Sequence, residues 1–337
     1  MEVPHDFIVF SGFLGSGKTT LLTDLLAAES DGGIAVIVND IGQVNIDGAL
    51  IAVQSGVPMA TLSNGCVCCS LTNDLPYTIE ALILERQRAE GAPFTKIILE
   101  CSGLSEPGGV LRSLSPLSAF GMRVRVVTTY ACDSLVRGDD FALAAAQLCA
   151  AHVIVLTRLD LATSEQITRA LAFVQVLGPM ASMVMERDRR ERAKAALATA
   201  NAGMPSPGRS ERLVALKGSG HPRIGVFAIQ WDERLDWPTL AAWLENAAGY
   251  LDTRLLRVKG LVLLNGADEP ILIQGVGQHF DTPRRVPGRE SVSSLVVISR
   301  DTDLAEIEAI QPVLPAARFA MLQSPGAMKR VHLARPS

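Results

Sequence analysis

The sequence predicts a two-domain protein, in which an α/β domain with a mostly parallel sheet at 1–205 precedes a smaller α+β domain at 221–337. Three observations support this prediction. Short β-branched runs alternate with longer helical patterns through most of the N-terminal half. The stretch NAGMPSPGRS at 201–210 is rich in Gly, Pro and Ser, which is typical of a linker or exposed loop. The pattern after it is different, and we place the linker at 206–220.

The composition is that of a globular protein rather than a disordered one, with 337 residues, 48% of them hydrophobic and 20% charged. The net charge of −4 predicts no nucleic-acid partner and no membrane partner. We expect no signal peptide, because Glu2 and Asp6 occupy the region where a cationic start and an apolar run would lie. We expect no transmembrane segment, because the apolar stretch from Phe141 to Leu156 is short and is broken by Gln147 and His152. The chain is therefore predicted to be cytoplasmic, with its clustered cysteines reduced.

The first domain is expected to contain five buried strands, at 7–10, 34–38, 96–99, 123–127 and 152–156. Each is a near-continuous apolar run, and such runs separated by helices favour a parallel sheet that is covered on both faces. Helical spacing is present at 19–29 and at 74–90.

The second domain is expected to begin with a strand at 223–231, followed by a capped amphipathic helix at 236–249. The segment 255–277 predicts two strands around a turn at Asn265–Gly266. A further strand at 295–299 and a last helix at 303–310 complete the predicted α+β arrangement.

The stretch GFLGSGKT at 12–19 follows a predicted strand, precedes a helix and matches the phosphate-loop pattern G-x-x-x-x-G-K-[ST]. The glycines let the backbone curl so that its N–H groups point at phosphate oxygens. We expect Lys18 to reach the β- and γ-phosphates and the Thr19 hydroxyl to ligate Mg²⁺. The first domain is therefore predicted to be a P-loop NTPase, and the strand–loop–helix context disfavours a chance glycine-rich turn.

A second element is the stretch IILECSG at 97–103, an apolar strand that ends in Glu100 with Gly103 three residues later. In P-loop NTPases an acid at such a strand end contacts the Mg²⁺ shell, and the glycine N–H senses the γ-phosphate. Most strands that end in a carboxylate do so only because they reach solvent. The phosphate loop favours the functional interpretation, with Lys18, Thr19 and Glu100 as the catalytic residues.

A third element bears on the base. Guanine-specific proteins commonly end a strand with N-K-x-D, and here Thr157, Arg158 and Asp160 occupy that pattern in VLTRLD. Asp160 is in place to accept hydrogen bonds from guanine, and the planar guanidinium of Arg158 is suited to stacking. Thr157 supplies no amide. The alternative interpretation is the N-cap region of a helix, and this element alone does not decide between GTP and ATP.

Together these motifs resemble the CobW-type GTPases, relatives of the urease and hydrogenase nickel-insertion GTPases. The resemblance rests on five stretches of the first domain and two of the second. They are GFLGSGKTTLL (12–22), VNDIGQVNID (38–47), NGCVCC (64–69), ECSGLSEP (100–107), TRLD (157–160), LLRVKGLVLL (255–264) and QGVGQHFD (274–281).

The resemblance covers nearly the whole chain and implies a GTP- and GDP-binding metallochaperone that uses Mg²⁺, carries Zn²⁺ or Co²⁺ and delivers it to a client metalloprotein. It also implies that the second domain is of the CobW C-terminal type. The predicted nucleotide contacts are Gly12, Gly15, Ser16, Gly17, Lys18, Thr19, Thr20, Gly103, Thr157, Arg158 and Asp160.

The motif SNGCVCCS at 63–70 places three thiols within four positions. Thiolates are soft ligands suited to such metals, and in an extended chain Cys66 and Cys68 point the same way while Cys69 points oppositely. No second Cys pair exists in the sequence to close a structural zinc site, so the predicted site is open and exchangeable. A redox role for Cys66 and Cys69, or simple packing, remains an alternative.

Two departures from the family pattern concern the metal. The family commonly carries N-E-x-G-E after its second strand, whereas this chain has Asp40 and Gln43 at the acidic positions. Asp40 is therefore a candidate metal ligand, and the loss of charge at Gln43 is expected to weaken a hard-donor contribution. The chain has no His-rich tract; His279 lies in a family motif, although a surface-loop histidine is the plainer interpretation, and His152 is expected in the core.

GTP hydrolysis is expected to be slow without a partner, because Leu104 rather than a catalytic Gln follows Gly103. One rival is a small-molecule kinase, whose lid would have to be the Arg-rich run 186–194, although that run is more simply a solvated helix face. A second rival is a metal- or redox-sensing binding protein with vestigial GTPase activity.

Overall fold

The fold is taken from a computed structural model of the 337-residue chain, in which the contacts divide residues 1–206 from residues 207–337. The structure describes residues 6–28, 33–39, 58–61, 70–114, 117, 122–134, 136, 140–178, 181–201, 223–287 and 292–323. The expected linker at 206–220 lies outside them. Each unit is considered by itself below.

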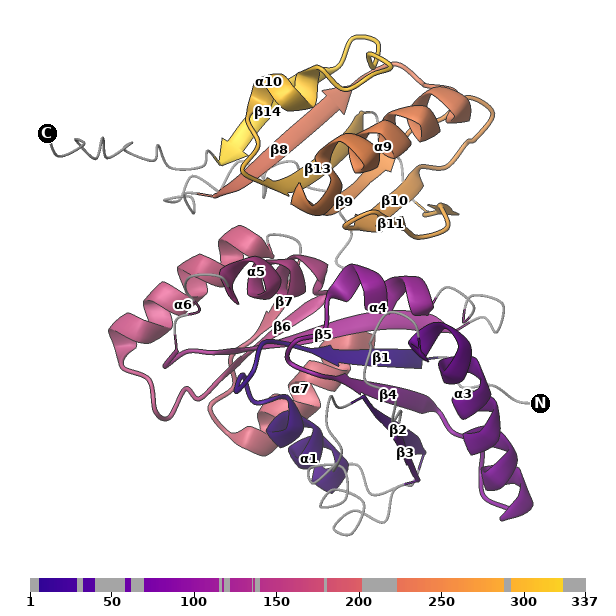
Figure 1. The fold of residues 1–337 in the computed structure, drawn as a ribbon, viewed down its shortest axis with the longest axis vertical. Coiled ribbons are helices and arrows are strands. Elements are labelled where there is room, and N and C mark those ends of the chain that lie inside the picture. The colour runs from indigo at the N-terminus through magenta and orange to yellow at the C-terminus, as the bar shows by residue number, and fades with distance from the viewer. Residues whose placement is uncertain are drawn as a thin grey trace, which may run out of the picture. The chain divides into compact units, whose positions relative to one another are not determined.

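The N-terminal unit is built on a seven-stranded sheet with the order β3-β2-β4-β1-β5-β6-β7 (Figure 1). Its strands are β1 (Asp6–Ser11), β2 (Ile34–Asn39), β3 (Met59–Thr61), β4 (Lys96–Cys101), β5 (Arg123–Ala131), β6 (Val153–Thr157) and β7 (Ser182–Val184). Every pairing between neighbours is parallel, which confirms the predicted fold class. All six residues of β2 are buried, as expected of a strand that is covered on both faces.

Helices cover both faces of this sheet. Their bounds are α1 (Lys18–Ala28), α3 (Ser70–Arg88), α4 (Pro107–Ser113), α5 (Asp140–Ala150), α6 (Ser164–Leu177) and α7 (Arg189–Asn201). On one face α1 and α7 pack over Ile8 and Phe10, and on the other α3 and α4 pack over Phe7 and Val9. Helices α5 and α6 continue the second layer beside α4 (Figure 1). Because the sheet is parallel, the carboxyl ends of its strands meet at one edge.

The C-terminal unit has an antiparallel sheet with the order β11-β10-β9-β13-β8-β14, and β12 pairs with β10. Its strands are β8 (Ile224–Trp231), β9 (Leu255–Val262), β10 (Ile271–Val276), β11 (His279–Phe280), β12 (Arg284–Arg285), β13 (Ser293–Arg300) and β14 (Arg318–Gln323). Helix α9 (Trp237–Leu251), which Asp236 caps, and the short α10 (Leu304–Glu308) lie on one face. Trp231 and Trp243 are fully buried in the core between that face and α9.

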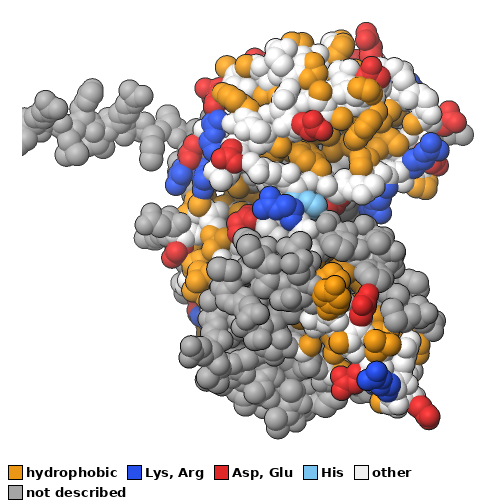
Figure 2. Space-filling view, turned by 45° about the vertical axis from the view of Figure 1, so that its right-hand side comes forward, with side chains coloured by type: hydrophobic (Ala, Val, Ile, Leu, Met, Phe, Trp, Pro, Cys, Tyr) orange, Lys and Arg blue, Asp and Glu red, His pale blue; other side chains and the backbone are white. Residues whose placement is uncertain are grey.

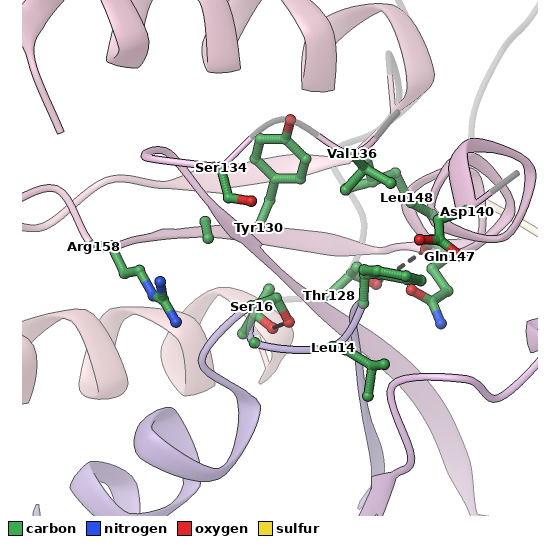
Figure 3. Close-up of a pocket in the computed structure, with 15 residues that line it drawn as sticks. Leu14, Ser16, Thr128, Tyr130, Ser134, Val136, Asp140, Gln147, Leu148 and Arg158 are labelled. Carbon is green, nitrogen blue, oxygen red and sulfur yellow. Dashed lines mark hydrogen bonds between the residues drawn. The ribbon is translucent and has the colours of Figure 1, made fainter. Parts of the chain in front are cut away.

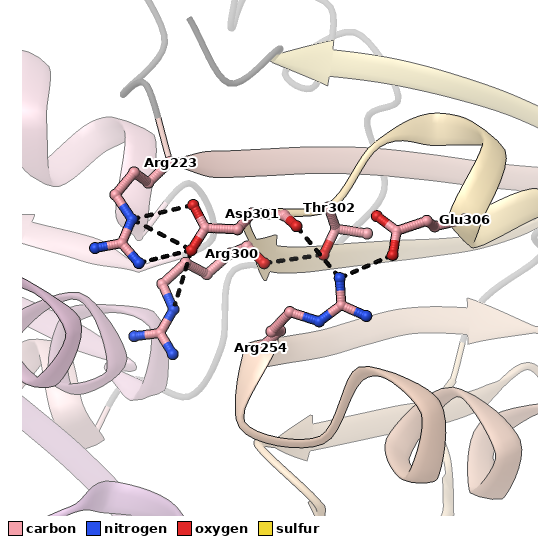
Figure 4. Close-up of polar contacts among 6 residues, drawn as sticks. All are labelled: Arg223, Arg254, Arg300, Asp301, Thr302 and Glu306. Atoms are coloured by element: carbon pink, nitrogen blue, oxygen red, sulfur yellow. Dashed lines mark hydrogen bonds and ion pairs between the residues drawn. The ribbon is translucent and has the colours of Figure 1, made fainter. Parts of the chain in front are cut away.

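Charged pairs lie at the outer parts of the C-terminal unit (Figure 4). The guanidinium of Arg223 donates to both carboxylate oxygens of Asp301, with a shortest distance of 2.6 Å. Arg254 donates to Glu306 at 2.8 Å and to the carbonyl of Asp301 at 3.2 Å. These hydrogen bonds hold the pKa values of Asp301 and Glu306 below the ordinary range.

Charges of both signs are mixed on the surface. On the face drawn in Figure 2, Lys and Arg side chains of the described residues are interspersed with Asp and Glu side chains. This distribution agrees with the small net charge of −4. Among the described residues, no helix is both long and apolar enough to cross a membrane.

Candidate nucleotide site

The phosphate loop connects β1 to α1 and depends on three glycines with positive φ. Gly12, Gly15 and Gly17 have φ values of 135°, 69° and 92°. At Gly12 an added Cβ would lie 2.5 Å from the Thr129 hydroxyl and 2.6 Å from the Thr129 carbonyl, so no side chain fits there. The predicted loop therefore forms at the carboxyl end of β1, and the sequence pattern GFLGSGKT follows from its backbone geometry.

Lys18 is buried at the start of α1, with 8% of its surface exposed. Its Nζ donates to the carbonyl of Gly12 at 2.9 Å and to that of Phe13 at 3.3 Å. The ammonium group therefore lies across the loop, at the place where the charge of a phosphate chain would be met.

The next residue joins the loop to a neighbouring strand. The Thr19 hydroxyl donates to Oε1 of Glu100 at 2.6 Å, and Glu100 is buried at the end of β4. A hydroxyl and a carboxylate side by side at a phosphate loop are the oxygen donors that Mg²⁺ prefers, so these residues fit the ion. The two candidate Mg²⁺ ligands, which are 81 residues apart in the sequence, are thus brought together.

Gly103 lies against the phosphate loop. A Cβ added to it would come within 2.7 Å of the backbone nitrogen of Leu14. The loop that carries Gly103 after β4 therefore touches the phosphate loop backbone to backbone. The role of Gly103 at the γ-phosphate stays a prediction, and the adjacent Leu104 is half exposed.

Hydroxyl groups from β5 and β6 support the loop. The hydroxyls of Ser16 and Thr129 share a hydrogen bond of 2.7 Å. The Thr157 hydroxyl donates to the carbonyl of Ser16 at 2.7 Å and to that of Tyr130 at 3.3 Å. The sequence predicted Thr157 as a nucleotide contact that lacks an amide. Its contact with Ser16 spans 141 residues, so no local pattern could have revealed it.

Arg158 and Asp160 follow β6 on a short turn. Arg158 has a φ of 53°, and its guanidinium donates to Asp133 at 3.2 Å. Its Nη2 lies 3.7 Å from the position of a Cβ on Gly15, so the side chain approaches the phosphate loop. Asp160 is exposed and does not cap α6, because Thr163 caps that helix in a reciprocal capping box with Gln166. The helix-cap interpretation of Asp160 is therefore wrong.

A pocket of about 300 Å³ joins most of the predicted nucleotide contacts. The predicted residues that line it are Gly15, Gly17, Lys18, Thr19, Thr20, Thr157, Arg158 and Asp160. Gly12, Ser16 and Gly103 are not among its lining residues. Its further wall includes Asp24, Arg189 and Arg192, which sequence reasoning did not assign to the site.

The Arg-rich run 186–194 only partly forms the solvated helix face that was expected. Arg192 is 6% exposed, and its guanidinium donates to the carbonyls of Glu186 at 2.6 Å and Arg187 at 2.8 Å. Burial lowers its pKa. Arg189 forms a two-bond pair with Asp24 of α1. The expectation fails at Arg192 because its side chain closes the turn before α7.

A second pocket of about 380 Å³ lies on the other side of the phosphate loop and shares Gly15 and Arg158 with the first. Figure 3 shows Arg158 at one end and Gln147, Asp140 and Leu148 of α5 at the other. The phosphate loop and β5 form the wall between these ends.

The residues that the sequence predicts as transition-metal ligands lie outside the described residues. Cys66, Cys68, Cys69, Asp40 and Gln43 all lie there. In the ranges that the structure describes, no group of three or more His, Cys, Asp or Glu side chains is placed to hold a metal ion.

The described cysteines are ordinary buried thiols. Burial raises the pKa of Cys101 to about 12 and that of Cys132 to about 11, so both are protonated at neutral pH. His152 accepts a hydrogen bond from the Val126 amide at 3.0 Å, next to β6. His279 lies in β11 with its Nε2 3.9 Å from Asp281.

Comparisons with known proteins agree with this geometry. The sequence model of the family described as CobW/HypB/UreG, nucleotide-binding domain, matches residues 6–185, and that of the Cobalamin synthesis protein cobW C-terminal domain matches residues 224–311. The zinc chaperone YjiA of Escherichia coli (strain K12) is 27% identical over 319 residues, which cover 91% of this chain and 97% of that protein. The zinc chaperone CobW of Pseudomonas aeruginosa is 28% identical over 345 aligned residues, with coverage of 89% and 88%.

A solved structure shares the fold. The crystal structure of Zn(II)-bound YjiA GTPase from E. coli matches with a TM-score of 0.64 and 21% identity, covering 92% of this chain and 98% of that one. The family match includes the phosphate loop, the Thr19–Glu100 pair and Asp160, and it extends over more than half of the sequence. The chain therefore belongs to the CobW/HypB/UreG family of nucleotide-binding domains and carries a cobW C-terminal domain after it.

Proposed function

We propose that this protein is a GTP-hydrolysing metallochaperone that binds a transition metal of the zinc or cobalt class and delivers it to a client metalloprotein. The observation that carries the proposal is the Thr19–Glu100 pair, 2.6 Å apart at a phosphate loop whose pocket also includes Asp160. Relatives named zinc chaperones and a relative titled a GTPase support the same assignment.

The nucleotide half of the function rests on positioning. The N–H groups of the phosphate loop and Lys18 bind the phosphates, and Thr20 lines the same pocket. Thr19 and Glu100 would hold Mg²⁺, which supplies charge stabilisation at the β- and γ-phosphates when bound. Gly103, packed on Leu14, is placed to contact the γ-phosphate through its backbone. No step needs a covalent intermediate.

Guanine specificity rests on Asp160 and Arg158. Asp160 is exposed at the pocket, where its carboxylate can accept hydrogen bonds from the ring N–H and amine of guanine. The guanidinium of Arg158 lies over the phosphate-loop side of the same pocket and can stack on the base. Thr157 contributes by holding Ser16 rather than by contacting the base.

The metal cargo is assigned to Cys66, Cys68 and Cys69, with Asp40 as a possible oxygen ligand. Thr61, Val38 and Glu100 lie in one row across β3, β2 and β4. Since neighbouring strands are about 4.8 Å apart, the backbone of Thr61 is about 10 Å from that of Glu100. The segment with the cysteines follows Thr61 of β3 in the sequence, and the segment with Asp40 directly follows Asn39 of β2.

The proximity of Thr61 to Glu100 supports coupling between the two sites. If GTP orders the segments after β2 and β3, GTP should tighten metal binding, and the metal should tighten GTP binding by the same factor. The test is the Zn²⁺ dissociation constant, measured by competition with a chromophoric chelator in Mg²⁺ with GDP or with a non-hydrolysable GTP analogue. We expect tighter binding with the analogue by about 5–150-fold.

The thiol assignment has its own control in the same assay. The double variant Cys66→Ser, Cys68→Ser should lose the ion and still fold and bind nucleotide, whereas Cys149→Ala, which removes a buried thiol outside the motif, should retain it. Identical Zn²⁺ constants in the two nucleotide states would contradict a nucleotide-gated carrier and favour redox sensing.

We further propose that the C-terminal unit contacts the client or regulates release.

A further inference from the structure

Gln147 of α5 is a deeply buried polar side chain beside the nucleotide site, with 1% of its surface exposed. Its Nε2 donates to the carbonyl of Gly103 at 3.0 Å and to that of Ser105 at 3.1 Å. Both amide hydrogens are therefore used on the loop that follows β4. A carbonyl oxygen and an amide oxygen are both acceptors and cannot bond to each other. The side-chain amide of Gln147 must therefore turn its NH₂ group toward the two carbonyls.

The backbone of Gln147 is fixed as well. The Thr128 hydroxyl donates to the Gln147 carbonyl at 3.1 Å, which ties this turn of α5 to β5 (Figure 3). The next residue on β5, Thr129, shares its hydrogen bond with Ser16 of the phosphate loop. A continuous set of contacts thus runs from the Gly103 loop through Gln147 and β5 to the phosphate loop.

The Gly103 loop is packed against the phosphate loop, so a shift of one backbone would move the other. Its glycine lies against the Leu14 backbone, as the 2.7 Å distance from a Cβ on Gly103 to the Leu14 nitrogen shows. Gln147 holds the opposite side of the same loop through two carbonyls. Because Gln147 bonds to the carbonyls of both Gly103 and Ser105, it also fixes the position of the backbone N–H groups between them. Those N–H groups are the ones that would face the phosphates.

The oxygen of the Gln147 side-chain amide differs from its nitrogen in having no partner among the described residues. Among the described residues, Oε1 of Gln147 is buried and has no hydrogen-bond partner, although it belongs to a residue that lines the second pocket. A buried acceptor without a partner costs stability, and an apolar residue of similar size would avoid that cost. The two bonds that the amide donates offset that cost.

We infer that Gln147 is a positioning residue for the γ-phosphate side of the site, which holds the Gly103 loop ready for GTP. This inference rests on the proposed guanine-nucleotide function. Without the two bonds, GTP must order the loop when it binds, whereas GDP, which has no γ-phosphate, does not use the loop. Loss of Gln147 therefore weakens GTP binding and spares GDP binding.

The test compares Gln147→Met, which keeps the volume and removes both bonds, with Gln274→Met, which makes the same change at a buried glutamine of the C-terminal unit. Affinities for Mg²⁺–GDP and for a Mg²⁺-bound non-hydrolysable GTP analogue are measured by titration with fluorescent nucleotides. We expect Gln147→Met to lower analogue affinity about tenfold or more relative to GDP affinity. Gln274→Met should leave that ratio at the wild-type value.

Should Gln147→Met fail to fold, Gln147→Asn keeps the amide on an arm too short for both carbonyls and should lower the ratio in the same direction. An unchanged ratio in a folded variant, or an equal loss for both nucleotides, would overturn the inference, since a purely structural role predicts those results. Wild-type protein that binds neither nucleotide would refute the proposed function and the inference with it. Normal wild-type binding with an unchanged ratio in the variant refutes the inference alone.

Discussion

The polar contacts around the nucleotide site of the N-terminal unit differ from the charged pairs drawn in Figure 4 for the C-terminal unit. In the N-terminal unit, neutral groups such as the Ser16 and Thr157 hydroxyls and the Gln147 amide are buried and bond to backbone or to each other. In the C-terminal unit, Figure 4 draws the ion pairs Arg223–Asp301 and Arg254–Glu306, and the side chains of Arg223 and Asp301 are 39% and 45% exposed. A nucleotide site needs fixed backbone positions, whereas the C-terminal unit is held by the apolar core around Trp231 and Trp243.

This difference has an energetic meaning. Breaking a buried hydrogen bond leaves a desolvated partner and costs about 1–3 kcal/mol, whereas an exposed ion pair contributes about 0–1 kcal/mol. Substitutions that touch the buried contacts should therefore alter function or stability far more than substitutions of the ion pairs. The variants below test that contrast.

Lys18→Ala should have the largest effect, because it removes the ammonium group that we propose to bind the β- and γ-phosphates. We expect GTP hydrolysis to fall at least about a hundredfold. The loop should still form, since its glycines and the Ser16 contacts remain. Lys194→Ala, which removes an exposed lysine paired with Glu191, should leave the rate unchanged. Steady-state phosphate release measures both, and a Lys18→Ala rate near wild type would remove Lys18 from the mechanism.

Alkaline pH should destabilise the N-terminal unit first. Burial raises the pKa of Cys101 and Tyr130 to about 12 and that of Cys132 to about 11. Groups with raised pKa values stabilise the fold fully below their ordinary pKa values near 9 to 10, and that stability is lost as pH rises toward 11–12. For the fully buried Cys101 thiol the loss is about 1.4 kcal/mol per pH unit.

The two units can be followed separately in this experiment, because all three tryptophans, Trp231, Trp237 and Trp243, belong to the C-terminal unit. Between pH 9 and pH 11, the urea midpoint by circular dichroism should fall further than the midpoint by tryptophan fluorescence. Below about pH 4 the order should reverse, since the lowered pKa values of Asp301 and Glu306 give stability that acid removes. Coincident midpoints at every pH would mean that the units unfold as one.

Asp160→Ala should remove the preference for guanine. Hydrogen bonds from a base to a carboxylate are worth about 1.5–3 kcal/mol, so GTP affinity should fall about tenfold to a hundredfold while ATP affinity stays the same. Glu165→Ala is the matched control, because this carboxylate of α6 is 81% exposed and pairs only with Arg169 among the described residues. Equal GTP and ATP affinity in the wild type would contradict the guanine assignment.

Arg223→Met should have the smallest effect. Its pair with Asp301 is exposed, so the free energy of unfolding of the C-terminal unit should fall by less than about 1 kcal/mol. Urea unfolding followed by tryptophan fluorescence measures this change directly. A loss above about 2 kcal/mol would show that the ion pairs contribute as much as the buried contacts and would end the contrast between the units.

Much of the fold could be predicted because it depends on patterns within short stretches of the sequence. The near-continuous apolar runs gave β1, β2, β4, β5 and β6, and the glycine spacing at 12–19 predicted the phosphate loop. The three-residue strands β3 and β7 were missed, since so short a run has no periodicity.

Residues of the site could be predicted only where they belong to a recognisable sequence motif. Thr19 and Glu100 each belong to a recognisable stretch, and the structure brings them together. Gln147 and Arg192 do not, because an amide in an apolar helix and an arginine in a basic run give no local sign of the distant carbonyls that they contact. Their roles depend on the packing of α5 and α7, which sequence periodicity does not fix. The cysteine motif stays a prediction, since it lies outside the described residues.

The two hydroxyl bonds at Ser16 bear on the time course of nucleotide capture. Because Thr129 and Thr157 already hold this residue, association does not have to wait for a loose phosphate loop to close. The association kinetics should then show no separate step of loop closure. Differences in affinity between nucleotides would appear as differences in residence time, so that the lifetime of the bound nucleotide sets how long each state of the protein lasts.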